Sequence, residues 1–405
     1  MKVLFAHNAI FGQFLHFAPW LRDRGHEVVV LHRDKAATGG DAGLVNFNDE
    51  PWHLENQAQH LREVENAVAT AAGSASAALK LRDAGFSPDI IIAHCGWGTG
   101  LLLKNVWPRA KYIAYHEWLY RANALAAPDT VAELTADRLV NFAHDAARNM
   151  PIVLEFLNAD ACWTPNEFQA SQFPKMFRDK ITITHDGVDV DKLKPDPEAR
   201  IDFPWLNLSG TEKIVTYIGR GFEPTRGFPD FLKAIEILQG AIPDLHTVII
   251  GENKVAYGEK LRAGDSWLHR TADSLNLDFS RIHLTGTIDH AHLRRILAAG
   301  TVHVYLTAPF VLSWSLAESM ALGCTVVASD LPAVQELITD GENGLLAAPG
   351  DVRAIAKQIK RCLENPRLRT KLGQAARESI VRNFDMNQAF EFRLQQMQEL
   401  IKGQD

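Results

Sequence analysis

The chain has 405 residues, too many for one ordinary domain, and this length favours two domains of about 200 residues each. Hydrophobic residues make up 46% of the chain and charged residues 22%, which excludes a disordered or fibrous protein. The formal net charge of -7 excludes a strongly basic protein, and it gives no indication of binding to nucleic acid or to a membrane surface.

The sequence shows no targeting or metal-site pattern. The N-terminal apolar run, residues 1–6, is too short to be the core of a signal peptide, and no run approaches the length of a transmembrane helix. We therefore expect a protein of the reducing cytoplasm. The four cysteines agree with this expectation, because they have neither zinc-site spacing nor a paired framework: Cys95, Cys162, Cys324 and Cys362.

The N-terminal half predicts an α/β domain with a doubly wound parallel sheet, which we place at residues 1–200. Residues 2–6 and 27–31 have the composition of buried strands and flank a helical segment, a pattern typical of a βαβ unit. The further elements expected in this domain are an Ala-rich helix within residues 51–86 and strands at 90–93, 111–115 and 180–184.

Three features follow strands of this domain. Gly12 follows the first strand, where the absence of a Cβ lets the backbone approach a ligand. Residues 94–100 are rich in glycine, and either close approach to a ligand or a tight strand-to-helix turn accounts for them. His116 follows the strand at 111–115, where a histidine either lines a binding site or packs as a structural residue.

A polar, proline-rich segment at residues 192–212 is the expected hinge. We place a second α/β domain at residues 210–385 and a separate terminal helix at 386–405. The strands expected in the second domain alternate with helical segments and lie at 213–218, 245–251, 281–287, 302–306 and 325–329.

The segment from Gly219 to Gly227 has the features of a diphosphate site. Arg220 and Arg226 flank a glycine-containing turn between an expected strand and an expected helix. Arginine supplies a permanent charge and paired N–H donors, both of which suit a diphosphate. The alternative is that both arginines are solvated loop charges.

Residues 302–329 predict a strand, a loop, a short helix ended by Gly323, and a second strand. The helix begins near Ser313, and Ser315 and Glu318 have the spacing of a capping box. A helix N-terminus at the carboxyl end of a parallel strand favours anions, so this segment predicts a phosphate or nucleotide site. Glu318 alternatively serves only as a capping carboxylate.

The same segment resembles the retaining family 4 glycosyltransferases of the GT-B fold. The resemblance is carried by LAESMALGCTVVAS at 316–329, DLPAVQEL at 330–337 and DGENGLL at 340–346, and it extends over nearly the whole chain. It implies two Rossmann-like domains facing a cleft, with the acceptor side in the first, the donor side in the second, and the terminal helix crossing back to the first.

The resemblance also implies the reaction. A glycosyl group would pass from a nucleotide diphosphate sugar, a UDP- or GDP-sugar, to a hydroxyl of a sugar or glycoconjugate, with retention at the anomeric carbon. The donor is then a substrate, and neither a metal nor a separate cofactor is expected.

Residue roles follow from the matched motifs. Arg220 and Arg226, after Gly219, match the diphosphate ligands, with Arg226 in place of the usual lysine. Glu318 matches the ribose ligand, and His116 matches a histidine near the donor sugar and the acceptor. The backbone positions that the resemblance places near the ligand are Gly12, beside the reaction centre, and Gly286 and Thr287, beside the nucleobase.

Phe310 departs from the family pattern, which has a glutamate there that contacts the donor sugar. We expect Phe310 to pack behind the loop and helix start formed by Ser313, Trp314 and Ser315, whose N–H and hydroxyl groups would bind the sugar instead. Two alternatives remain open at this point: a nucleotide-sugar epimerase of the same fold, and a nucleotide-sugar-binding module without catalytic activity.

Overall fold

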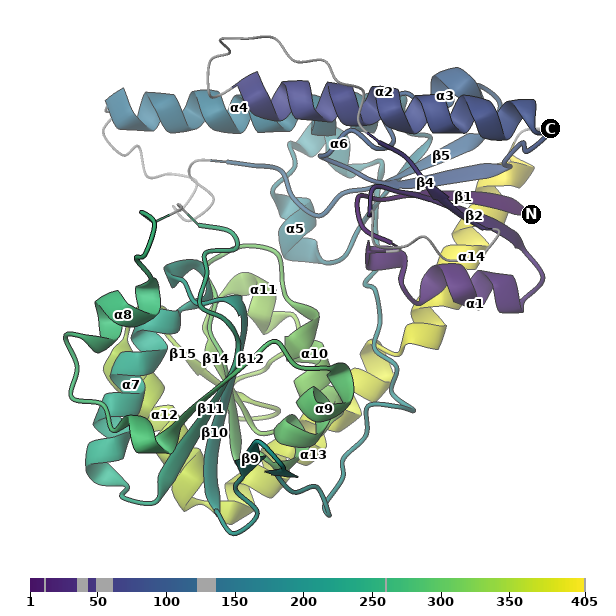
Figure 1. Cartoon of the computed structure of the whole chain (residues 1–405). Helices are drawn as coiled ribbons and strands as arrows, with labels where there is room; N and C mark the ends of the chain where they lie inside the picture. Colours follow the sequence, from purple (N-terminus) through teal and green to yellow (C-terminus); the bar gives the residue numbers. More distant parts are fainter. Residues whose placement is uncertain (11, 35–42, 49–60, 122–135, 259–260, 404–405) are drawn as a thin grey trace. The chain divides into compact units, whose positions relative to one another are not determined.

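The computed structural model describes residues 1–10, 12–34, 43–48, 61–121, 136–258 and 261–403. The chain divides into two compact units. The first comprises Met1–Asp186 and Gln388–Asp405, and the second comprises Gly187–Asn387. Each unit has a parallel sheet with helices packed against it (Figure 1). Residues 51–60, part of the expected Ala-rich helix, lie outside the described residues.

The first unit contains a seven-stranded parallel sheet with the order β3-β2-β1-β4-β5-β6-β7. The order reverses between β1 and β4, so their carboxyl ends form a topological switch point, where open α/β sheets usually bind ligands. The strands are β1 (Lys2–Ala6), β2 (Glu27–His32), β3 (Leu44–Asn46), β4 (Ile90–His94), β5 (Lys111–Tyr115), β6 (Ala161–Thr164) and β7 (Ile181–Ile183).

The helices of the first unit pack through small and aromatic residues. The described part of the Ala-rich segment is α2, whose buried face is mostly alanine, so the helix can pack closely. The helices are η1 (Gly12–Phe14), α1 (Phe17–Asp23), α2 (Arg62–Asp83), α3 (Leu103–Val106), α4 (Ala136–Asn158), α5 (Glu167–Ser171), α6 (Lys175–Arg178) and α14 (Met386–Lys402).

Helix α14 belongs to the first unit from Gln388 onward. Its Arg393 is fully buried, and Nη2 donates to the Thr184 carbonyl at 3.0 Å and to Asp186 Oδ1 at 2.9 Å. Its Phe390 ring lies 5.0 Å from that of Phe17. A buried ion pair with additional hydrogen bonds therefore fixes the position of this helix within the unit.

The second unit contains a six-stranded parallel sheet with the order β12-β11-β10-β13-β14-β15, and a two-stranded antiparallel sheet, β8-β9. The strands are β8 (Asp202–Phe203), β9 (Leu206–Asn207), β10 (Lys213–Gly221), β11 (Leu245–Glu252), β12 (Ile282–Gly286), β13 (Val302–Tyr305), β14 (Val326–Ser329) and β15 (Leu345–Ala347).

Figure 1 shows α7, α8 and α12 on one face of the six-stranded sheet and α9, α10 and α13 on the other. The apolar core therefore has two layers, one on each face. The helices are η3 (Pro224–Arg226), α7 (Phe228–Ala241), α8 (Trp267–Ala272), η4 (Phe279–Arg281), α9 (His290–Ala299), α10 (Trp314–Ala321), α11 (Pro332–Gln335), α12 (Val352–Glu364) and α13 (Pro366–Asn383).

Strand β10 extends beyond the expected end at 218, to Gly221, with an irregularity in its pairing with β11 between Gly219 and Gly221. The irregularity brings the two backbones close together, since a Cβ at Gly251 would lie 1.7 Å from the Gly219 carbonyl oxygen. Only glycine fits at position 251, which also has a φ of +133°. This extension carries Arg220 to the exposed carboxyl edge of the sheet.

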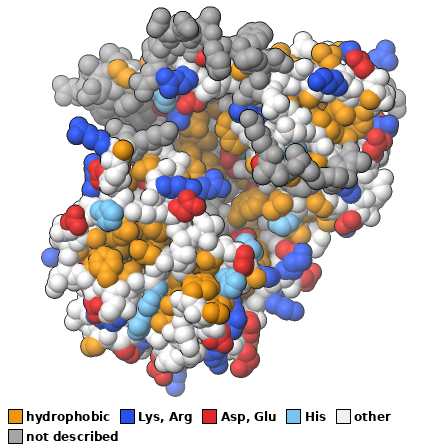
Figure 2. Space-filling model, viewed as in Figure 1, with side chains coloured by type: hydrophobic (Ala, Val, Ile, Leu, Met, Phe, Trp, Pro, Cys, Tyr) orange, Lys and Arg blue, Asp and Glu red, His pale blue; other side chains and the backbone are white. Residues whose placement is uncertain are grey.

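Over the described residues, acidic and basic side chains are interspersed on the visible face of the molecule (Figure 2). This distribution agrees with the modest net charge of -7. No described helix combines the length and the apolar character that a membrane span requires.

Candidate functional site

Arg226 is a buried cation at the carboxyl edge of the second sheet, 7% exposed. Its Nη1 donates to Thr307 Oγ1 at 2.9 Å and to the Val311 carbonyl at 3.2 Å. The Tyr217 hydroxyl donates to the Arg226 carbonyl at 2.8 Å, which fixes the turn. Among the described residues, no carboxylate forms an ion pair with Arg226 or Arg220. A buried charge without a counter-ion is costly, so the geometry suits an anionic ligand.

Two aromatic rings lie beside these arginines. The Tyr257 ring centroid is 5.0 Å from the guanidinium carbon of Arg226 and 5.9 Å from that of Arg220. The Phe310 centroid is 5.8 Å from the Arg226 guanidinium and 5.6 Å from the Tyr257 ring. Cation–π contacts at these distances favour the charged group without neutralising it. Tyr257 could not be predicted from the sequence, because a single tyrosine in a polar loop has no distinguishing pattern.

Glu223 holds the loop that carries Tyr257. Its carboxylate is fully buried and accepts three consecutive backbone N–H groups, from Ala256 at 3.3 Å, Tyr257 at 3.0 Å and Gly258 at 2.7 Å. Hydrogen bonds from neutral donors to a carboxylate are stronger than those between two neutral groups. Glu223 is therefore a positioning residue for Tyr257, and only the proximity of the two segments in the fold reveals it.

The start of α10 differs from the expected capping box, and that prediction was wrong. Ser313 is the N-cap, with extended backbone angles (φ -81°, ψ 142°), and its Oγ accepts the Ser315 N–H at 3.3 Å. Ser315 lies inside the helix, and its own hydroxyl donates to Ser313 Oγ at 3.0 Å. The Ser313 N–H donates to the Tyr305 hydroxyl at 2.9 Å. Because the residue before Trp314 adopts the extended conformation, the helix begins two residues earlier than the box requires.

Glu318 consequently lies in the second turn of α10, away from a capping role. Its Oε1 is 3.3 Å from Nε2 of His290, the first residue of α9, and this contact raises the pKa of His290. The Glu318 side chain is 18% exposed and that of His290 is 57% exposed. A pair this open to solvent contributes little to stability, which leaves the carboxylate available to a ligand.

The remaining predicted donor-site residues lie at the same edge of the second sheet. Gly286 ends β12 with a φ of +68°, and the Thr287 hydroxyl donates to Glu252 Oε1 at 2.7 Å. Trp314, the first residue of α10, is 36% exposed. The topology thus places the residues after β10, β12 and β13 at one carboxyl edge.

Of the two predicted residues of the first unit, His116 is buried and Gly12 is partly buried. His116 is 1% exposed, neither ring nitrogen has a hydrogen-bond partner, and burial lowers its pKa to about 3. Its ring lies 5.4 Å from Phe156 and 5.5 Å from Phe173. Gly12 has a φ of +45°, and a Cβ there would lie 2.0 Å from His7 Cε1. Gly12 is therefore needed locally to make room for the His7 ring.

The glycine-rich segment 94–100 fits the tight-turn interpretation. Gly98 has a φ of +84°, and a Cβ there would lie 2.0 Å from the Ala67 carbonyl oxygen of α2. The Thr99 hydroxyl donates to the His94 carbonyl at 3.0 Å. The close approach of α2 and the positive φ therefore require the glycine at position 98 without any ligand.

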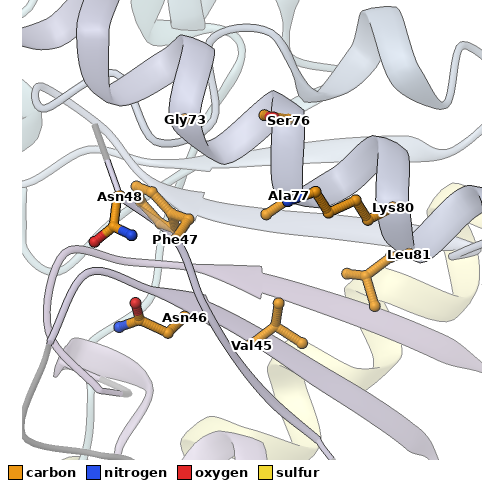
Figure 3. Close-up of a pocket in the computed structure, with 9 residues that line it drawn as sticks. All are labelled: Val45, Asn46, Phe47, Asn48, Gly73, Ser76, Ala77, Lys80 and Leu81. Atoms are coloured by element: carbon orange, nitrogen blue, oxygen red, sulfur yellow. The ribbon is translucent and has the colours of Figure 1, made fainter. Parts of the chain in front are cut away.

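A pocket with a volume of ≈ 330 Å³ lies between β3 and α2 of the first unit (Figure 3). None of the predicted site residues lines it, and Lys80 is the one charged residue of the lining. The lining residues are Val45, Asn46, Phe47, Asn48, Gly73, Ser76, Ala77, Lys80 and Leu81.

Comparisons with known proteins give matches in both halves of the chain. Residues 24–193 match the model of the "Glycosyl transferase family 4 group", and residues 212–365 match that of "Glycosyl transferases group 1". The chain is 30% identical over 215 residues to phosphatidyl-myo-inositol mannosyltransferase of Mycobacterium leprae. That match covers 52% of this chain and 51% of the relative, so it spans about half of the relative's length.

Two solved structures are similar over the full chain. Sucrose-phosphate synthase from Thermosynechococcus elongatus has a TM-score of 0.77 at 18% identity, with 100% of both chains covered. Anabaena HepE in complex with UDP-glucose has a TM-score of 0.68 at 16% identity, also with 100% of both chains covered. At these identities the likeness establishes a shared fold.

Proposed function

Because the chain belongs to the family 4 glycosyltransferases of the GT-B fold, we propose that it transfers a glycosyl group from a nucleotide diphosphate sugar to a hydroxyl. The anomeric configuration would be retained. The acceptor would be a sugar or a glycoconjugate, and the reaction would belong to the biosynthesis of a glycan, polysaccharide or glycoconjugate. The protein would carry out this reaction in the cytoplasm.

The observation that supports this proposal most strongly is the unpaired, buried Arg226. Its guanidinium is held by Thr307 and Val311 before any ligand arrives, so no reorganisation is needed when the diphosphate binds. Arg220 adds a second, exposed charge at the same sheet edge. Two arginines at the end of one strand match the charge of a diphosphate and its need for paired donors.

The other contacts of the donor follow from the positions of the matched residues. Glu318 would accept hydrogen bonds from the ribose hydroxyls, and the backbone at Gly286 and Thr287 would lie along the nucleobase. The donors at the start of α10, from Ser313, Trp314 and Ser315, would bind the sugar in place of the glutamate that Phe310 replaces. Gly219 would allow the diphosphate to approach the backbone.

In the first unit, Gly12 would lie beside the transferred sugar, and the buried His116 would lie behind that part of the site. The low pKa of His116, about 3, means that its imidazole is neutral near pH 7. With both nitrogens buried and the ring packed on Phe156 and Phe173, such a ring would act by packing and not through charge.

The reaction would be metal-independent. When the bond between the anomeric carbon and the phosphate oxygen breaks, the electron pair stays on the diphosphate, and the arginines stabilise the negative charge. The departing phosphate would accept the proton of the acceptor hydroxyl. The acceptor oxygen would then bond to the anomeric carbon on the face that the phosphate leaves. This route needs no protein base.

A UDP-sugar is the first donor to test, since the HepE structure contains UDP-glucose, and GDP-sugars follow. The purified protein would be incubated with each nucleotide sugar and a panel of alkyl glycosides, and products would be followed by ¹H NMR. Release of the nucleoside diphosphate together with a new glycoside of the same anomeric configuration as the donor supports the proposal. Free nucleotide with an epimerised sugar identifies an epimerase, and binding without turnover identifies a binding module.

A further inference from the structure

A second cluster of polar side chains lies at the switch point of the first sheet, apart from the arginines of the second unit. His7 follows β1, His94 ends β4, and Glu117 lies two residues after β5. The β1 and β4 strands are the neighbours between which the strand order reverses. The carboxyl ends of strands at such a point form the usual ligand-binding crevice of an open α/β sheet.

The hydrogen bonds of this cluster have a defined direction. The Ala9 N–H donates to His7 Nδ1 at 2.9 Å, and in the tautomer that accepts this bond Nε2 carries the proton, while Nδ1 also lies 3.1 Å from the Ala9 carbonyl oxygen. His7 Nε2 can then donate to Gln13 Oε1, 2.7 Å away. The Gln13 amide nitrogen in turn donates to Glu117 Oε1 at 2.6 Å. Burial lowers the pKa of His7 to about 4, in agreement with a neutral ring.

Glu117 ends this chain of hydrogen bonds as an anion. Burial alone would raise its pKa, but the contacts with His94 and Gln13 outweigh that effect and lower it. Oε2 lies 3.3 Å from His94 Nε2, and the Glu117 side chain is 21% exposed. The two ring nitrogens of His94, itself 3% exposed, lack a hydrogen bond of normal geometry. The cluster therefore contains a partly exposed carboxylate that is backed by a buried imidazole 3.3 Å away.

Trp97 adds an apolar surface beside these groups. Its ring stacks on that of His94, with centroids 4.3 Å apart and planes at 16°, while 39% of the residue remains exposed. The turn that carries Trp97 is fixed by the fully buried Glu155 of α4, which accepts the N–H groups of Gly96 and Gly100, each at 3.0 Å. The indole is thus held in place, at low entropic cost to a ligand that packs on it.

We propose that Glu117 and Trp97 bind the acceptor, supported by the buried His94 that contacts both, and that the acceptor is a sugar with neighbouring hydroxyls and an apolar C–H face. This inference rests on the proposed transferase function. A carboxylate accepts hydrogen bonds from two adjacent hydroxyls, and the buried His94, 3.3 Å from Glu117 Oε2, helps to hold the carboxylate in place. An exposed indole packs on the C–H face of a sugar ring, because an aromatic ring offers a large apolar area. His7 and Gln13 position the carboxylate and do not touch the ligand.

The test uses the full chain with 5-fluorotryptophan in place of tryptophan and follows ¹⁹F NMR. The Trp97 resonance is identified by its loss in Trp97→Phe. The probes are the methyl glycosides of glucose, galactose, mannose and N-acetylglucosamine, and tetramethylammonium as a cationic probe. We expect a saturable shift of the Trp97 resonance with at least one glycoside, and binding weakened about tenfold or more in Glu117→Gln, which removes the charge of one hydrogen-bond acceptor.

Glu27→Gln is the matched control, because Glu27 begins β2 at the opposite edge of the same sheet and its side chain is 53% exposed. Its glycoside affinity should equal that of the wild type. The melting temperature of each variant shows whether it is folded. If Glu117→Gln fails to fold, Glu117→Asp, which keeps the charge but shortens the side chain, takes its place, and weaker glycoside binding is expected at the same Trp97 resonance.

Three outcomes would overturn the proposal. They are the absence of any shift at Trp97 with every glycoside, binding that is the same in Glu117→Gln and Glu27→Gln, and binding of tetramethylammonium alone. UDP affinity of the wild type is measured in parallel by calorimetry. If the wild type does not bind UDP, the proposed function is refuted. If it binds UDP but no glycoside, only the acceptor site is refuted.

Discussion

Replacing Arg226 by methionine should weaken nucleotide binding without weakening the fold. Methionine has nearly the length of the arginine stem, so it removes the charge without opening a large cavity. The Thr307 hydroxyl, which accepts from Arg226 in the wild type, retains the Ala308 carbonyl as a partner at 2.9 Å. The substitution therefore leaves no buried hydroxyl unpaired.

The expected loss of affinity follows from the hydrogen bonds that Arg226 would make to the diphosphate. A charge-assisted hydrogen bond contributes about 1.5 to 3 kcal/mol, which corresponds to a rise in Kd of roughly 10-fold to 150-fold. The free energy of unfolding should stay the same or increase, because a buried charge without a carboxylate partner is removed. Stability and binding should thus respond differently.

Isothermal titration calorimetry with UDP measures the affinity, and differential scanning fluorimetry without ligand measures the melting temperature. Arg361→Met is the control, since Arg361 is an exposed residue of α12 in the same unit. A Kd for UDP within twofold of the wild type in Arg226→Met would refute the reasoning. A large fall in melting temperature would show instead that Arg226 is structural.

Substitutions at three further residues test the second unit. Glu318→Gln should weaken UDP binding and leave the melting temperature nearly unchanged, because the helix is capped by another residue and the exposed pair with His290 contributes at most about 1 kcal/mol. Phe310→Glu should reduce donor turnover and UDP affinity in the assays above, because the new carboxylate would compete for the nearby guanidinium; faster turnover would contradict this. Glu223→Gln should raise the KM for the donor more than it lowers kcat, because Tyr257 would be held less firmly, and Glu223→Asp should restore part of the loss; equal effects in both variants would refute a positioning role.

The sequence predicted the fold class and the family, and both are confirmed. Strand positions could be predicted because parallel strands buried on both faces appear as short, continuous apolar runs. Residues 90–93 and 302–306 are examples, and they correspond to β4 and β13. Arg220 and Arg226 could be identified as candidates because the chemistry of a diphosphate site narrows the choice of residue at the end of a strand.

The features that the sequence did not predict depend on contacts between distant segments. Glu223 accepts hydrogen bonds from the backbone of residues 256–258. These bonds form because the loop after β10 packs against the loop after β11. The Ser315 and Glu318 spacing favoured a capping box, but the backbone angles of Ser313 placed the cap two residues earlier. In the first unit, the chain of hydrogen bonds from His7 to Glu117 joins residues of two strand ends, and no local pattern marks it.

The most direct test of the central claim is a crystal structure of the protein with UDP. Our account predicts that oxygens of the diphosphate lie within about 3 Å of the Arg226 guanidinium and that the ribose hydroxyls meet the Glu318 carboxylate. Electron density for UDP in the pocket between β3 and α2, or at any site where Arg226 keeps only its contacts with Thr307 and Val311, would contradict the account.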